Sequence, residues 1–141
     1  MNEAIDLSAL NWVQQELGVT LKQGRQFLEE YAGGNHGAES LNNCMACLHE
    51  ARGPLRIVGL NGADLLATEM EEVLNDLLND RLDTRETAME ALMQAFIQLP
   101  DYLFTLRSSR RESAAALLPV INQLRTARGA VVMPEGAAFS P

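Results

Sequence analysis

The sequence predicts an all-α fold in which five helices form an antiparallel bundle. Apolar residues recur at steps of three, four and seven positions along most of the chain, as on the buried face of an amphipathic helix. No stretch alternates apolar and polar residues over a useful length, so no strand is indicated. Breaks of only a few residues separate the periodic stretches, and short connections place consecutive helices side by side and antiparallel.

A glycine-rich break at residues 33–37 separates the first two helices. The first helix begins near Asp6 or Ser8, because either side chain can accept a hydrogen bond from a free backbone N–H group as an N-cap. The second helix runs from about residue 38 towards residue 58. Pro54 lies inside it and removes one backbone hydrogen bond, so we expect a kink or irregularity just before the proline.

The last three helices follow the same apolar pattern. The third is predicted over about residues 63–79. The fourth follows a cap at Asp83–Thr84 and is expected to kink at Pro100. The fifth is predicted over about residues 112–127, where Pro119 is expected to interrupt it.

Length and composition favour a single soluble domain. The 141 residues are predicted to form a bundle over residues 1–129 and an irregular tail or linker over residues 130–141. The charge is −8, from 11 Lys and Arg against 19 Asp and Glu, which argues against a nucleic-acid partner. No apolar run approaches the roughly 20 residues of a membrane span, and the N-terminus lacks the basic region of a signal peptide. We therefore expect a cytoplasmic protein with no membrane partner.

The sequence lacks the motifs of a self-sufficient ATP-using enzyme. It contains no phosphate-binding G-x-x-x-x-G-K-[ST] loop, no G-x-G-x-x-G after a strand and no G-x-S-x-G elbow. No cofactor is expected.

Cys44 and Cys47 allow several interpretations. The residue Leu48 separates Cys47 from His49, so the C-x-x-C-H pattern of haem attachment is absent. A zinc site needs four ligands, and only His49 or His36 could join the two cysteines. A redox pair would normally stand in a βαβ unit. We expect the two cysteines to pack as small apolar residues on a buried helix face and no metal to be bound.

His49 is predicted to lie on the exposed face of the second helix. At about 100° per residue, it points roughly 130° away from the centre of the apolar face. Arg52, Gly53 and Arg56 follow on the same exposed stripe. An exposed imidazole can act as a nucleophile near pH 7, two arginines favour a phosphoryl group, and a glycine leaves room for it. The alternative is an ordinary solvated histidine.

The spacing of these residues resembles the H-x-x-K-G-x-x-x-x-x-G signature of histidine-containing phosphotransfer (HPt) domains. His49, Gly53 and Gly59 match it, and Arg52 stands where Lys is usual. The resemblance implies a helical bundle whose histidine accepts a phosphoryl group. In CheA-type kinases a glutamate on the following helix orients the imidazole, and an ungapped count places it at Glu71.

A closer resemblance extends over nearly the whole chain. It is to the N-terminal region of type IV pilus chemosensory kinases of the ChpA/PilL type, to which the FimL scaffold is related. The matching segments include A-L-N-W-V, C-L-H-E-A-R-G-P-L, G-A-D-L-L-A-T-E-M-E, Q-L-P-D-Y-L, L-L-P-V-I-N-Q-L-R-T-A-R-G and P-E-G-A-A-F-S-P. The resemblance implies an HPt-like four-helix bundle with an additional helix.

Two functions follow from this resemblance. In the first, a CheA-like kinase catalytic domain phosphorylates His49, Glu71 orients it, Arg52 and Arg56 steady the phosphoryl oxygens, and a response-regulator receiver then takes the group. In the second, the bundle is an inert scaffold or docking module for pilus-regulatory proteins, since Gln commonly replaces His49 in the FimL branch. The Arg110–Arg111 pair suits such an adaptor.

The predicted third helix also carries a run of acidic residues. Its members are Glu69, Glu71, Glu72, Asp76 and Asp80. We interpret the run as a solvated face, with a docking surface for a basic partner as the alternative. The negative charge is expected to be uneven, because Arg52 and Arg56 form a local positive strip beside His49.

Overall fold

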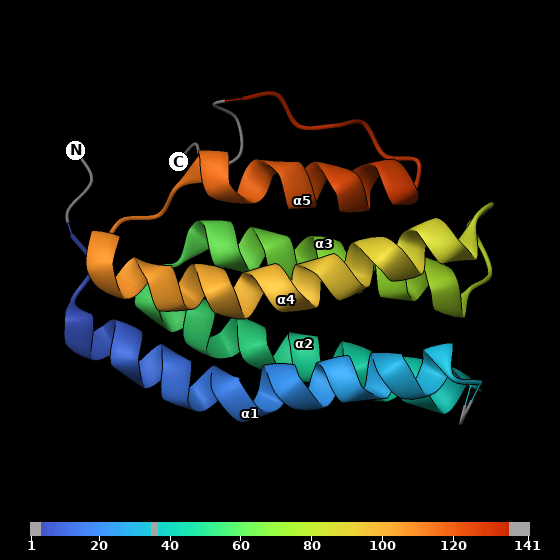
Figure 1. The fold of residues 1–141 in the computed structure, drawn as a ribbon, viewed down its shortest axis with the longest axis horizontal. Coiled ribbons are helices and arrows are strands. Elements are labelled where there is room, and N and C mark those ends of the chain that lie inside the picture. The colour runs from blue at the N-terminus through green and yellow to red at the C-terminus, as the bar shows by residue number, and fades with distance from the viewer. Residues whose placement is uncertain (1–3, 35–36, 136–141) are drawn as a thin grey trace.

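The computed structural model describes residues 4–34 and 37–135 and is all-helical in these ranges (Figure 1). The five helices are α1 (Leu7–Ala32), α2 (Gly37–Val58), α3 (Asn61–Leu78), α4 (Arg85–Ser109) and α5 (Ala114–Ala127). The predicted fold class is therefore confirmed, with helix ends within a few residues of the expected ones.

The first four helices form a closed ring, and α5 covers one side of it. α1 packs against α2 and α4, and α3 completes the ring between α2 and α4. α5 lies over α3 and α4, on the side of the bundle away from α1 (Figure 1). The interior is filled mainly by Leu and Ala side chains, with Phe96 as its largest member. Gly24 of α1 leaves room for the Phe96 ring, because an added Cβ would lie 3.0 Å from it.

Local polar residues set several helix boundaries. Asp6 is the N-cap of α1, as one of the two expected caps, and its carboxylate accepts from the Ser8 N–H at 3.0 Å. Gly59 makes the turn between α2 and α3 with φ +81°, a conformation that strains other residues. Thr84 stands at the N-cap of α4 without a side-chain hydrogen bond to the helix. After the turn at Gly59 and Leu60, α3 runs antiparallel along α2.

The three internal prolines do not end or divide their helices. Pro54, Pro100 and Pro119 each lie inside a helix that continues on both sides. The expected interruption at Pro119 is therefore wrong. Pro100 and Pro119 occupy exposed positions on their helices, so their rings do not disturb the packing of the interior.

Glu112 was expected to start the fifth helix but instead caps α3. Its carboxylate accepts the N–H groups of Gly62 at 2.9 Å and Ala63 at 3.0 Å, and the Tyr102 hydroxyl at 3.0 Å. The N-terminus of α3 is the positive end of its dipole, which favours this negative charge. Burial, and then the charge of Glu112, raise the pKa of Tyr102. Ser113 is the actual N-cap of α5.

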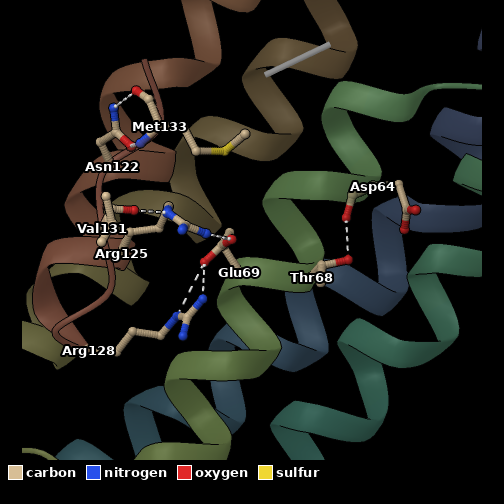
Figure 2. A network of polar contacts seen from close by, with 8 residues as sticks. All are labelled: Asp64, Thr68, Glu69, Asn122, Arg125, Arg128, Val131 and Met133. Carbon is tan, nitrogen blue, oxygen red and sulfur yellow. Dashed lines mark hydrogen bonds and ion pairs between the residues drawn. The ribbon is translucent and has the colours of Figure 1, made fainter. Parts of the chain in front are cut away.

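Residues 130–133 are irregular but are tied to α5. Asn122 donates its side-chain amide to the Met133 carbonyl at 3.0 Å and accepts the Met133 N–H at 2.7 Å (Figure 2). The Arg125 Nε donates to the Val131 carbonyl. The first part of the expected tail therefore folds back along α5.

Candidate functional site

His49 lies on the exposed surface of α2, beside α3. Its side chain is 75% exposed, and its Nδ1 is 3.6 Å from Oε2 of Glu71. That distance is within ion-pair range but longer than a hydrogen bond. The structure thus brings together the two residues that sequence reasoning paired, and leaves Nε2 as the nitrogen farther from the carboxylate.

Glu71 lies mostly buried between His49 and Arg52. Its side chain is 17% exposed, and its Oε1 is 3.6 Å from Nη1 of Arg52. Within the described part of the chain, this Oε1 is buried and has no hydrogen-bond partner. A buried carboxylate oxygen without a donor is unusual, because such atoms are normally hydrogen-bonded. Glu71 therefore has unused hydrogen-bonding capacity next to the exposed imidazole.

Asp64 on α3 is a site residue that the sequence analysis missed. Its carboxylate accepts from Arg52 Nε at 2.8 Å and from Arg56 Nε at 3.3 Å. Burial opposes the charge of Arg52, but the hydrogen bond and charge of Asp64, followed by Glu71, outweigh it and raise the pKa of Arg52. No local pattern in the sequence points to Asp64, because its contacts depend on how α3 packs along α2 after the turn at Gly59 and Leu60.

The predicted positive strip beside His49 is therefore neutralised. Arg52 is 16% exposed and is held by two carboxylates, so its guanidinium is not free to receive a ligand in this conformation. Arg56 is 60% exposed and shares Asp64. The expectation of a locally positive surface is wrong, because the carboxylates of Asp64 and Glu71 on α3 balance the charges of Arg52 and Arg56 on α2.

The two glycines of the predicted signature have different surroundings. A Cβ added at Gly53 would meet nothing within 4 Å, so the surface one turn from His49 is open there. Gly59 also has open space, but its positive φ makes it a turn residue rather than a contact residue.

The acidic run of α3 is not one solvated face. Glu69 is 4% exposed and lies on the side of α5, where Arg125 Nη1 donates to it at 2.7 Å and Arg128 Nη2 at 3.0 Å (Figure 2). Asp76 pairs with Arg81, and Asp80 with Arg85. The interpretation as a solvated face is wrong for Glu69, because α5 covers it.

The cysteines are free and buried, as expected for apolar packing. Cys44 and Cys47 form no disulfide. Burial raises the pKa of both thiols. Among residues 4–34 and 37–135, no three His, Cys, Asp or Glu side chains gather as metal ligands would. His36, the other histidine considered for zinc, lies outside the described residues.

The comparison with known proteins identifies the family. Residues 7–133 match the FimL C-terminal domain family. The chain belongs to this family. It is 33% identical over 133 residues to the scaffold protein FimL of Pseudomonas aeruginosa, an alignment that covers 94% of this chain. The expected relation to FimL is thereby confirmed.

The alignment covers most of this chain but only part of the relative. The chain spans about a quarter (24%) of the length of that scaffold protein. The family match ends at residue 133, where Met133 is bound to Asn122, so the residues folded back along α5 belong to the matched unit. None of the helices in the described ranges is both long and apolar enough to cross a bilayer.

Proposed function

We propose that this chain is a docking module of a FimL-type scaffold and that it binds regulatory proteins of a type IV pilus chemosensory pathway. The observation that carries the proposal is the family match over residues 7–133, together with the relative's description as a scaffold protein. The neutralised arginines beside His49 support it, because Arg52 is engaged by Asp64 and Glu71 instead of being open to a phosphoryl group.

This proposal predicts that binding does not depend on the histidine. Wild type and His49→Gln would be titrated calorimetrically with receiver domains and pilus-regulatory proteins from the same organism. The two forms should bind at least one of them with equal affinity, and both should restore twitching in a strain that lacks the protein. Failure of the wild-type protein to bind any of these partners would remove the proposal.

Phosphotransfer at His49 is the second candidate, and one observation favours it. The imidazole is 75% exposed and its Nδ1 faces Glu71, which suits a neutral ring with Nδ1–H and a nucleophilic Nε2. Nε2 would attack the γ-phosphorus of ATP held by a CheA-like kinase domain; the N–P bond forms as the bond to the ADP oxygen breaks. A receiver aspartate would then take the phosphoryl group. Arg56, as the more exposed arginine, would reach its oxygens first.

A labelling experiment separates the two functions. Under the docking proposal, neither wild type nor His49→Gln gains acid-labile phosphate from labelled ATP and a cognate kinase catalytic fragment. Labelling of wild type that disappears in His49→Gln would instead establish the phosphoacceptor. The same kinase fragment acting on its own HPt domain is the positive control.

A further inference from the structure

α4 carries apolar side chains on its outer surface as well as on its buried side. Ile97 is 45% exposed and Phe104 is 60% exposed, and Pro100 between them is also exposed. Met93, one turn before Ile97, is half-buried. These four residues follow one another at steps of four, three and four positions, so they share one face of the helix. Apolar residues at this spacing form the seam against which a second helix packs in a coiled coil.

Opposite charges stand at the two ends of this apolar row. Glu90 lies three positions before Met93, and Arg107 lies three positions after Phe104. The Arg107 guanidinium is 5.8 Å from the centre of the Phe104 ring, a contact that keeps the charge beside the apolar residues. Glu90 and Arg107 are both exposed, and in the part of the chain that the structure describes neither has an ion-pair partner. We call this acid, the four apolar residues and this base the outer stripe of α4; it is about 25 Å long.

A cavity lies beside the middle of the outer stripe. It measures about 210 Å³ and lies between α1 and α4, with Leu17, Gly18 and Leu21 on one side and Pro100 on the other. A Cβ added at Gly18 would meet nothing within 4 Å, so no side chain of this chain fills that space. An apolar side chain that approaches Pro100 from outside therefore has a hollow to enter.

We propose that the outer stripe of α4 binds the same stripe of a second copy of this chain, with the two helices antiparallel. The steps of three, four, three, four and three positions read the same in both directions, so the stripe is complementary to itself about a two-fold axis. Antiparallel pairing places Glu90 of each copy opposite Arg107 of the other. A parallel pair would place Glu90 against Glu90 and Arg107 against Arg107, so the charges select the antiparallel arrangement.

The apolar residues between these ends also match. Met93 lies opposite Phe104 of the second copy, and sulfur–aromatic contacts are favourable. Ile97 lies opposite Pro100 and its cavity. Two chains of charge −8 repel each other, and one helix face is a small interface, so we expect a weak dimer whose register is set by the charges at its ends. This association goes beyond the proposed docking function and does not depend on it.

Exchanging the end charges tests the pairing directly. Sedimentation equilibrium should show the average mass of wild type rising with concentration from that of the monomer towards twice that value. Glu90→Arg and Arg107→Glu each place like charges opposite each other at both ends, so each should weaken the dimer about tenfold. The two changes combined in one chain should restore it, because opposite charges again face each other. An equimolar mixture of the two single variants should associate for the same reason.

Two isoleucines provide a matched pair of apolar variants. Ile97→Glu should weaken the dimer about tenfold or more, because it adds two like charges to the centre of the interface. Ile57→Glu makes the same change at a residue that is 76% exposed but lies on α2, which does not contact α4 in the described ranges. It should leave the dimer unchanged. Circular dichroism during thermal unfolding verifies that every variant is folded.

Four results would overturn the inference. They are a chain that stays monomeric up to about 1 mM, single charge variants that associate as well as wild type, a combined variant that associates no better than either single one, and equal weakening by Ile57→Glu and Ile97→Glu. The two proposals can also fail separately. If Ile97→Glu is monomeric and still binds pathway partners, both stand; if wild type dimerises but binds none of these partners, only the docking proposal fails.

Discussion

Glu69 and Glu71 lie two residues apart on α3, yet they have opposite environments. Successive helical residues are about 100° apart, so α3 turns Glu69 towards α5 and Glu71 towards α2. Both oxygens of Glu69 accept hydrogen bonds from arginines of α5 and its end. Glu71 makes only longer contacts, at 3.6 Å, to His49 and Arg52, and its Oε1 has no donor within the described residues.

This difference separates Glu69, whose carboxylate holds helices together, from Glu71, whose carboxylate can still accept a hydrogen bond. The Glu69 side joins α3 to α5 and, through Arg125, to the residues that fold back after α5. The Glu71 side ends at an exposed imidazole. Changes on the first side should therefore cost stability, and changes on the second should alter the surface that a partner meets.

The largest expected effect is on the buried side. Glu69→Gln removes the charge that holds Arg125 and Arg128, and we expect a loss of about 3 kcal/mol in the free energy of unfolding. The value is at the low end for a buried pair because both arginines are about one-fifth exposed. Urea unfolding at pH 7 measures it.

Asp80→Asn is the matched control for this change. Asp80 also pairs with an arginine, Arg85, but its side chain is 87% exposed. Exposed pairs contribute little, so the control should differ from wild type by no more than about 0.5 kcal/mol. Equal losses in the two variants would contradict the distinction between the buried acid of α3 and the exposed acid in the turn after it.

A smaller effect is expected at Arg52. Arg52→Met keeps the apolar stem of the side chain but leaves Asp64 and Glu71, both mostly buried, without their shared cation. We expect a loss of about 1–2 kcal/mol by urea unfolding. Because the pKa of Arg52 is raised from an already strongly basic value, its stabilising effect is present below that value and should be constant between about pH 6 and pH 9. A loss that changes steeply within this range would contradict the assignment.

The helices were predictable because their apolar spacing is local. Caps such as Asp6 act within one turn and could be read from neighbouring residues. The role of Glu112 could not be predicted in this way, because the N–H groups that it binds, those of Gly62 and Ala63, are about fifty positions away in the chain. The prediction for Glu69 was wrong for the same reason: an acidic residue is expected to face solvent unless the arginines that pair with it are known.

The site was predictable only in part. Helix geometry and the HPt resemblance were enough to name His49 and Glu71, which the structure places at ion-pair distance. The contacts of Asp64 depend on how α3 packs along α2 after Gly59, and the apolar spacing of neither helix determines this packing. The roles of His49, Glu71, Arg52, Arg56, Gly53 and Gly59 in phosphotransfer stay predictions.

Glu71→Gln should change the imidazole more than the fold. The buried Oε1 of Glu71 accepts no hydrogen bond from the residues that the structure describes, so we expect a change of less than about 1 kcal/mol in stability. Loss of the negative charge near Nδ1 should shift neutral His49 towards the tautomer with its proton on Nε2. Long-range ¹H–¹⁵N NMR of the ring measures the tautomer ratio. An unchanged ratio would mean that Glu71 does not orient the ring.

The smallest expected effect is at Gly53, on the open surface beside His49. Gly53→Ala should change the stability of the protein by no more than about 0.5 kcal/mol, because alanine favours the helix but its Cβ would crowd the ring of Pro54, the next residue. Gly59→Ala is the contrasting variant and should lose about 1–2 kcal/mol, because its φ is +81°. Thermal unfolding measures both, and if Gly53→Ala also weakens a partner that His49→Gln does not, the partner contacts this surface through shape rather than through the imidazole.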